Sequence, residues 1–295
     1  MPNLSDIKKR ISTVSSTCQI THTMEMVSTA KIRAATDRIM AATPYANAMN
    51  DMLAYAAQNA DASLNPLLAT REKVAHATII AVVSDRGLAG GFNHNVLKRV
   101  EQKIAAYQSA GATVSVIACG KKALPFLSYR NIVPVQQYVD LSANPTIAQA
   151  RQIAQYVIKA FRDGDTDEVC LVYNHARNAA DQDLIEQTIL PLDTSAVETH
   201  EATDQGIPSG ELVFEPNANA VLESLLPDYV VAMVYRGLLD SAAAEQGARR
   251  KAMKSATDNA QEIINTLQIS YNRARQSAIT TEITEIIGGA AALEE

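Results

Sequence analysis

Glycine and proline are unevenly placed along this chain of 295 residues, and their placement limits the folds available to it. Residues 3–43 contain neither residue type, and no proline follows Pro227. The segment 87–227 holds eight of the 12 Gly and seven of the 10 Pro. Because glycine and proline interrupt helices, the sequence predicts two long terminal helices that flank a centre rich in turns.

Apolar residues in both terminal segments recur at spacings of three and four, which is typical of a coiled coil. In the first segment they are Leu4, Ile7, Ile11, Val14 and Cys18, with a shift of register expected near Ile20, Met24 and Val27. In the last segment they are Ala260, Ile263, Leu267, Tyr271, Ala274 and Ala278. Pro44 is expected to stop or kink the first helix, which resumes over 45–60.

The predicted terminal helices are too long for the centre to bury. At about 1.5 Å per residue, residues 3–43 extend about 60 Å and residues 228–287 about 90 Å. The two helices therefore need each other, a partner, or both.

The centre alternates between short apolar runs and amphipathic runs. Strands are expected over 77–83, 113–119, 131–135 and 168–174. Helices are expected over 92–109 and 146–162, and a short helix after the second strand is expected to end at Leu127. Such alternation is typical of parallel strands with helices on both faces of the sheet. The predicted fold class is therefore α/β, with an N-terminal coiled-coil helix over 1–60, a Rossmann-like α/β domain over 74–216 and a C-terminal coiled-coil helix over 218–292. Residues 176–216 carry only one further assignment, a short strand over 211–214.

Composition excludes several classes of protein. A nucleic-acid-binding protein needs a basic face or aromatic rings that stack on bases. The formal net charge of −6 and the aromatic content of 5% argue against that class. The three Cys lie far apart, which favours a reducing compartment. No uncharged apolar run reaches 18 residues, and the first ten residues lack the apolar core of a signal peptide. Residues 1–38 carry six Lys/Arg against three Asp/Glu, which suits an acidic partner as well as a solvated helix face.

Motifs that suggest chemistry are incomplete. Ser84–Gly91 follows an expected strand and opens an expected helix, as a phosphate loop does, but its glycines lack the GxGxxG spacing. Asp163–Asp167 resembles the start of a calcium loop, but Glu168 stands where that loop needs glycine. The five His form no zinc pattern. Both segments are interpreted as structural turns, and the sequence predicts no catalytic residue, no cofactor and no metal.

Two hypotheses remain from the residues alone. One is an interaction or mechanical protein whose long coiled coil transmits a force or a conformation. The other is a small α/β enzyme with helical arms for oligomerisation. The missing catalytic motifs favour the first hypothesis.

Four segments, in order, resemble the gamma subunit of F-type ATP synthases. They are Ile7–Ile11 with Gln19–Val27, Ser84–Asn93, Glu245–Ala260, and Ile279–Ala292. The last agrees with the family's C-terminal pattern (I/V)TxExx(D/E)xxxGA at every fixed position. The sequence is therefore identified as a member of this family over essentially its whole length.

The resemblance implies a rotor function. In this family the terminal helices form an antiparallel coiled coil inside a ring of three alpha and three beta subunits, and the α/β domain lies against the epsilon subunit and the c-subunit ring. The expected function is to couple proton flow through the c ring to ATP synthesis or hydrolysis on the beta subunits. We therefore expect no catalytic site in this chain, and membrane contact only through the c ring.

The resemblance also implies contact residues. Arg275, Gln276, Thr280 and Glu282 match family positions that touch the beta subunits, with Met24 and Arg249 nearby. Phe214 and Glu215 match the stretch near the epsilon subunit and the c ring, although an ordinary strand end explains them equally well. The uncharged stretch 286–293 is expected to turn in an apolar collar.

Departures from the family pattern concern a few positions. His22 and Thr23 stand where the family often has Lys and Ala, and Ala89 stands where it often has Cys. Cys119 and Cys170 do not form the closely spaced regulatory pair of chloroplast members. These features, with no transit peptide, favour a bacterial protein on the cytoplasmic face of the plasma membrane, held there as a peripheral subunit.

Overall fold

The computed structural model describes residues 4–59, 65–71, 73–178, 181–192 and 214–293. The chain divides into two compact units. The first, the coiled-coil unit, comprises Met1–Ser28 and Arg250–Glu295, and the second, the body, comprises Thr29–Arg249. These units cut across the predicted segments 1–60, 74–216 and 218–292, because each terminal helix contributes to both.

A five-stranded sheet forms the centre of the body, with strand order β3-β2-β1-β4-β5. Its strands are β1 (His76–Val82), β2 (Thr113–Cys119), β3 (Gln136–Tyr138), β4 (Glu168–Ala176) and β5 (Gln182–Leu190). The first four are parallel, as predicted, and β5 pairs antiparallel with β4. The strands β1 and β4 are almost wholly buried, as strands covered on both faces should be.

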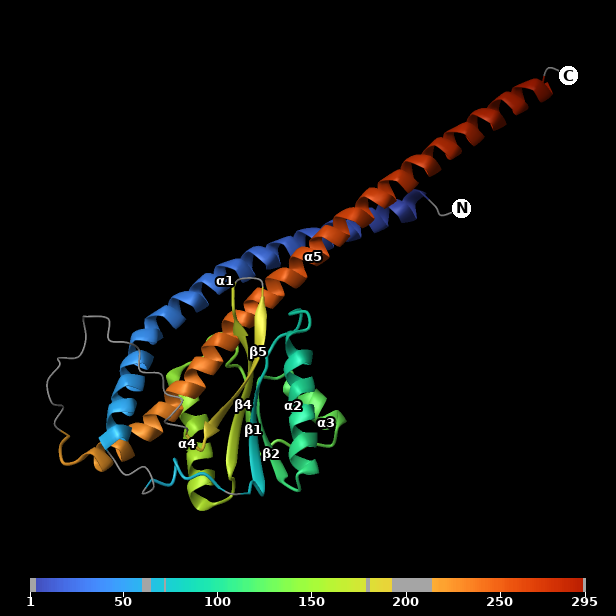
Figure 1. The fold of residues 1–295 in the computed structure, drawn as a ribbon. Coiled ribbons are helices and arrows are strands. Elements are labelled where there is room, and N and C mark those ends of the chain that lie inside the picture. The colour runs from blue at the N-terminus through green and yellow to red at the C-terminus, as the bar shows by residue number, and fades with distance from the viewer. Residues whose placement is uncertain (1–3, 60–64, 72, 179–180, 193–213, 294–295) are drawn as a thin grey trace. The chain divides into compact units, whose positions relative to one another are not determined.

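Helices cover both faces of the sheet (Figure 1). On one face, α2 (Phe92–Ser109) and α3 (Ala123–Tyr129) enclose a core with residues such as Ile79 and Val172. On the other face, α4 (Ile147–Asp163) and the body parts of α1 and α5 enclose a second core with Ile80 and Leu171. The α/β class and the arrangement of helices on both faces are thus confirmed.

The third strand was predicted in the wrong place. The strand is Gln136–Tyr138, and the predicted residues 131–135 form no strand. Asn131 adopts a positive φ of 57°, Val133 is exposed, and Pro134 lacks the N–H that a ladder needs. The apolar run therefore lies before the edge strand rather than in it.

The strand β5 was missed because its sequence, QDLIEQTIL, mixes polar and apolar residues without strict alternation. As an edge strand it is covered less completely than β1 and β4. Of the predicted strand over 211–214, residues 211–213 lie outside the described part, and Phe214 is not in a strand.

The two terminal helices are α1 (Leu4–Asn59) and α5 (Ala218–Leu293). Of the two predicted effects of Pro44, a stop or a kink, the stop does not occur, because α1 continues through Pro44, and α5 likewise continues through Pro227. Within the described ranges, no helix is both long enough and apolar enough to cross a membrane.

In the coiled-coil unit the helices run antiparallel, and α5 continues past the point where α1 begins (Figure 1). The predicted seam Leu4, Ile7, Ile11, Val14 and Cys18 faces inward, since each of these residues is buried or half-buried. Two details of the prediction are wrong. The register does not shift after Cys18, because Thr21 and Ser28 continue the heptad, and in α5 the buried residue is Ile264 rather than Ile263.

Candidate functional surfaces

A polar contact holds the two helices of the coiled-coil unit in register. The Thr257 hydroxyl donates to the Thr21 hydroxyl at 2.7 Å, and the Thr21 hydroxyl lies 3.0 Å from the carbonyl of Cys18. The Cys18 thiol lies 3.8 Å from the carbonyl of Thr257. Because a buried polar pair loses its partner if one helix slips, it specifies one register.

Large apolar side chains lie on the outside of the same unit. Thr21 and Ser28 are 9% and 1% exposed, whereas their neighbours Ile20 and Val27 are 60% and 49% exposed. The other exposed apolar residues of this unit are Met26, Ile263, Ile269, Ile279, Ile283, Ile286 and Ile287. Sequence reasoning expected an apolar contact only over 286–293 and placed Ile20, Val27 and Ile263 in the seam, so it missed this part of the surface. A recurrent row of exposed apolar groups marks a surface for a partner.

Most of the predicted contact residues lie on this outer surface. Arg275, Gln276, Thr280 and Glu282 are all exposed on one stretch of α5. The Thr280 hydroxyl donates to the carbonyl of Gln276 at 2.9 Å, which is a bond within the helix. Met24, on α1, is half-buried. The arrangement leaves the polar ends of the α5 group available for bonds to another chain.

Arg249 is different, because it is buried within the body. Its guanidinium lies 2.7 Å from the Glu245 carboxylate and donates to the carbonyls of Arg86 and Gly87, at 3.3 and 3.1 Å. Burial raises the pKa of Glu245, and the Arg249 charge opposes that rise. Arg249 therefore fastens the turn after β1 onto α5.

That turn, Ser84–Gly91, is held by the protein's own groups. Asn93 accepts from the Ser84 N–H at 2.9 Å, and the Asp85 carboxylate accepts from the N–H groups of Lys121, Asp140 and Ser142, each at 3.0 Å. Partial burial raises the pKa of Asp85, but these N–H bonds outweigh it, so the pKa lies below its ordinary value. The carboxylate therefore ties the turn after β1 to the segments that follow β2 and β3.

The segment Asp163–Asp167, which resembles the start of a calcium loop, forms the turn between α4 and β4. Gly164 ends α4 with a positive φ of 81°, and Asp167 accepts from the N–H groups of Ala75 and His76, at 2.8 and 2.9 Å. Gly164 thus allows the turn between α4 and β4, and the Asp167 bonds tie that turn to the start of β1. Across the described segments, no cluster of His, Cys, Asp and Glu could hold a metal ion.

The two residues predicted to lie near the epsilon subunit and the c ring differ in exposure. Phe214 packs against the core that contains Leu222 and Leu226, while Glu215 is exposed. Both stand just before α5 begins at Ala218. Phe214 anchors the start of α5, and only Glu215 presents its side chain outward.

Comparison with known proteins gives one consistent answer. The family model described as "ATP synthase" matches residues 3–293. The ATP synthase gamma chain of Chlorobaculum tepidum is 41% identical over 299 residues and covers 100% of both chains. That of Desulforamulus reducens is 42% identical over 294 residues, again covering 100% of both chains.

Solved structures agree on the fold. A chain in the central stalk and c ring of the Tetrahymena thermophila mitochondrial ATP synthase has a TM-score of 0.58 and 25% identity, covering 80% of this chain and 99% of its own length. A chain of the Euglena gracilis mitochondrial ATP synthase has a TM-score of 0.67 and 20% identity, covering 98% and 94%. The second likeness concerns the fold alone.

Proposed function

Because the chain belongs to the ATP synthase gamma chain family, we propose how its surfaces serve rotation. The chain is the central-stalk rotor subunit of an F-type ATP synthase and contributes to ATP synthesis and proton transport. Its partners are the alpha and beta subunits, three of each, the epsilon subunit and the c ring. It has no catalytic site of its own and stands on the cytoplasmic face of a bacterial plasma membrane, reached only through the c ring.

The single observation that carries this proposal is the exposed apolar surface of the coiled-coil unit. The large apolar side chains of Ile279, Ile283 and Ile286 are exposed to solvent. This exposure does not stabilise the free chain, because apolar surface is favoured when it is removed from water. An apolar collar formed by the alpha and beta subunits removes this surface from water without directional bonds. Such a contact permits rotation, since its energy changes little with angle.

Directional contacts come from the polar group Arg275, Gln276, Thr280 and Glu282, and Met24 adds an apolar contact nearby. These side chains form bonds with a beta subunit at one angle of rotation and lose them at the next. A bond to a charged group contributes about 1.5–3 kcal/mol, which is enough to favour one dwell position over another. Glu215 provides the contact with the epsilon subunit or the c ring. Phe214 contributes to this contact because it lies next to Glu215 in the chain.

Arg249 acts indirectly, through the turn after β1. Its bonds to the carbonyls of Arg86 and Gly87 hold the turn that presents exposed Leu88. We assign Arg249 as a positioning residue for this turn. Arg249→Met should remove these bonds and leave Glu245 buried without its partner, costing about 3 kcal/mol. Arg249→Lys should recover part of the stability, since it restores the charge but not the forked geometry.

Single-molecule rotation of the assembled enzyme tests the directional contacts. Gln276→Leu and Glu282→Gln should leave assembly intact and lengthen dwells or lower torque. The matched controls are Gln268→Leu and Glu262→Gln, which alter exposed residues of the same helix. Unchanged torque and dwell times in both test variants would refute the assignment of these contacts.

Assembly tests the apolar surface separately. Ile286→Asp should prevent incorporation into the alpha–beta ring, because it places an unpaired charge in an apolar collar. The free chain should keep its thermal stability, since Ile286 is exposed there. Normal yields of active enzyme with Ile286→Asp would show that the collar does not enclose this residue. ATP hydrolysis by the purified chain without beta subunit would overturn the absence of a catalytic site.

A further inference from the structure

Glu245 is a carboxylate enclosed by protein where α5 passes the turn after β1. The residue is 2% exposed, and its Oε1 lies 2.7 Å from the Arg249 guanidinium. Its Oε2 is buried as well and has no hydrogen-bond partner in the part of the chain that the structure describes. A buried polar atom without a partner is costly, most of all when it carries charge. The ionised form of Glu245 is therefore only half satisfied.

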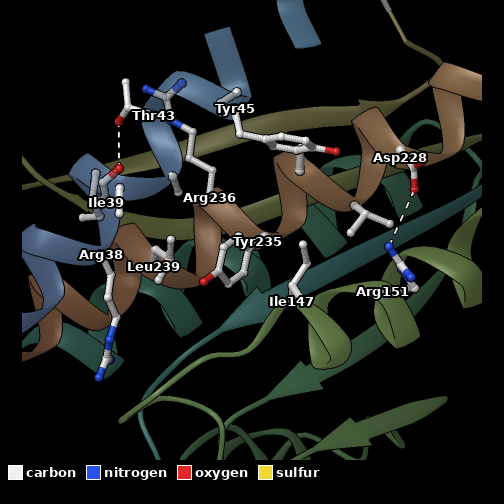
Figure 2. A pocket seen from close by; sticks show the side chains of 15 residues that line it. Arg38, Ile39, Thr43, Tyr45, Ile147, Arg151, Asp228, Tyr235, Arg236 and Leu239 are labelled. Atoms are coloured by element: carbon white, nitrogen blue, oxygen red, sulfur yellow. Dashed lines mark hydrogen bonds and ion pairs between the residues drawn. The ribbon is translucent and has the colours of Figure 1, made fainter. Parts of the chain in front are cut away.

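The charged groups around the cavity between α1, α4 and α5 differ from Glu245, because water reaches them. Figure 2 shows the guanidinium groups of Arg38 and Arg236 pointing to opposite ends of this cavity, and both residues are exposed. Arg151 and Asp228 line it as an exposed pair, 3.9 Å apart. Solvent stabilises the charges of these four groups, whereas Glu245 depends on the protein alone.

Three groups from different parts of the body face Glu245. They are Arg249 on α5 itself, Asp85 in the turn after β1, and Ser142 in the segment after β3. The two carboxylate oxygens of Asp85 together accept three N–H bonds, each at 3.0 Å, which keep its pKa below the ordinary value. When Glu245 is ionised, the charged members of the group are two carboxylates and one guanidinium. A single proton makes the group neutral.

That proton belongs on Glu245 rather than on Asp85. N–H donors already occupy both oxygens of Asp85, whereas Oε2 of Glu245 is free. Burial raises the pKa of Glu245 and the Asp85 charge adds to the rise, while Arg249 and Ser142 oppose it without cancelling it. The Ser142 Oγ accepts from the Asp85 N–H at 3.0 Å and keeps a second lone pair. A protonated Glu245 can donate to that lone pair.

We propose that Glu245 forms a proton-dependent joint between α5, the turn after β1 and the segment after β3. The proton comes from solvent and returns there when the pH rises. With the proton in place, the Glu245 hydroxyl donates to Ser142 and the repulsion from Asp85 ends, while Arg249 keeps its bonds to the turn. The hold of α5 on this turn therefore strengthens as the pH falls.

The pH dependence of unfolding tests the joint in the purified full-length chain. Because the pKa of Glu245 is raised in the folded protein, the folded state keeps a proton that the unfolded state releases above the ordinary value of 4.5. The stability that this proton provides is fully present below pH 4.5 and is lost as the pH rises through the raised pKa.

Glu245→Gln removes the titration and keeps the shape of the side chain. Its amide donates to Ser142 and accepts from Arg249, as a protonated Glu245 does. Urea denaturation gives the unfolding equilibrium constant of each protein at each pH. The constant of wild type divided by that of Glu245→Gln should rise with pH, by up to tenfold per pH unit between 4.5 and the raised pKa. Glu262→Gln, at an exposed position of α5, is the matched control and should show no such rise.

Carboxyl ¹³C NMR of wild type provides a measurement that does not require a variant to fold. One glutamate signal should titrate above the ordinary range, and this signal should be missing from the spectrum of Glu245→Gln. The absence of such a signal in wild type would overturn the proposal. So would a ratio of unfolding constants that does not change with pH, or an equal rise in Glu262→Gln.

Discussion

The body and the coiled-coil unit distribute their apolar side chains in opposite ways. In the body, Ile79, Ile80 and Leu171 are fully enclosed between the sheet and its helices. In the coiled-coil unit, Thr21 and Ser28 are inside while Ile20 and Val27 are outside. The body therefore has a large enclosed core, although some of its side chains, such as Tyr129 and Val133, are exposed, whereas the coiled-coil unit has only a narrow seam inside. Stability and function are separated between the two regions, and mutations should separate them too.

The largest expected effect is in the body, at Gly120. This residue has a φ of 107°, and a Cβ placed on it would lie 2.1 Å from the carbonyl oxygen of Val83. Gly120→Ala should therefore force β1 and β2 apart and cost more than about 3 kcal/mol, of which the backbone conformation alone accounts for about 1–2 kcal/mol. Urea denaturation followed by circular dichroism measures the loss.

Gly111→Ala is the control for Gly120→Ala. Gly111 also has a positive φ, of 82°, but nothing lies within 4 Å of its would-be Cβ. Gly111→Ala should therefore lose only the part of the stability that comes from the backbone conformation, about 1–2 kcal/mol. Equal losses in the two variants would mean that close packing of the body is not what makes Gly120 sensitive.

A smaller effect is expected in the coiled-coil unit, where neighbouring isoleucines differ in burial. Ile264 is 7% exposed and Ile263 is 50% exposed. Ile264→Ala should cost about 2 kcal/mol by removing buried apolar contacts, and Ile263→Ala should cost less than about 0.5 kcal/mol. Amide hydrogen exchange should increase over 4–28 and 250–270 only in Ile264→Ala, while protection of the sheet is unchanged. Faster exchange in the sheet would contradict the independence of the two regions.

The smallest effect concerns the pH dependence of the turn after β1. The pKa of Asp85 is lowered in the folded protein, so its ionised form adds stability above the ordinary value of 3.8, and this is lost as pH falls through the lowered pKa. Asp85→Asn should cost about 1 kcal/mol at pH 7, because its amide N–H₂ cannot accept from an N–H donor. The difference from wild type should shrink below pH 3.8.

Asp165→Asn, at an exposed position, is the control for Asp85→Asn. Thermal unfolding measured from pH 3 to 7 compares the two variants with wild type. A stability difference between Asp85→Asn and wild type that is independent of pH would show that the charge on Asp85 does not stabilise the turn.

Local patterns in the sequence were sufficient for much of this fold. The absence of glycine and proline over 3–43 predicted a long helix, and the run TVSVIAC predicted β2 with its observed bounds. The C-terminal signature over 279–292 predicted the family. The predicted group Arg275, Gln276, Thr280 and Glu282 does lie on one exposed stretch of α5. In each case the signal is contained within a few helical turns or one strand.

Only the tertiary structure decided which apolar residues are buried and which are left for a partner. Ile263 and Ile264 are identical in chemistry and adjacent in sequence, and only the position of the other helix distinguishes them. Arg249 was predicted as an outward contact, but its bonds to Arg86 and Gly87 arise from residues more than 160 positions away. The strand β5 likewise depends on hydrogen bonds to β4 rather than on its own pattern. Sequence periodicity specifies elements because their bonds are local, whereas burial and pairing depend on segments that meet only when the chain has folded.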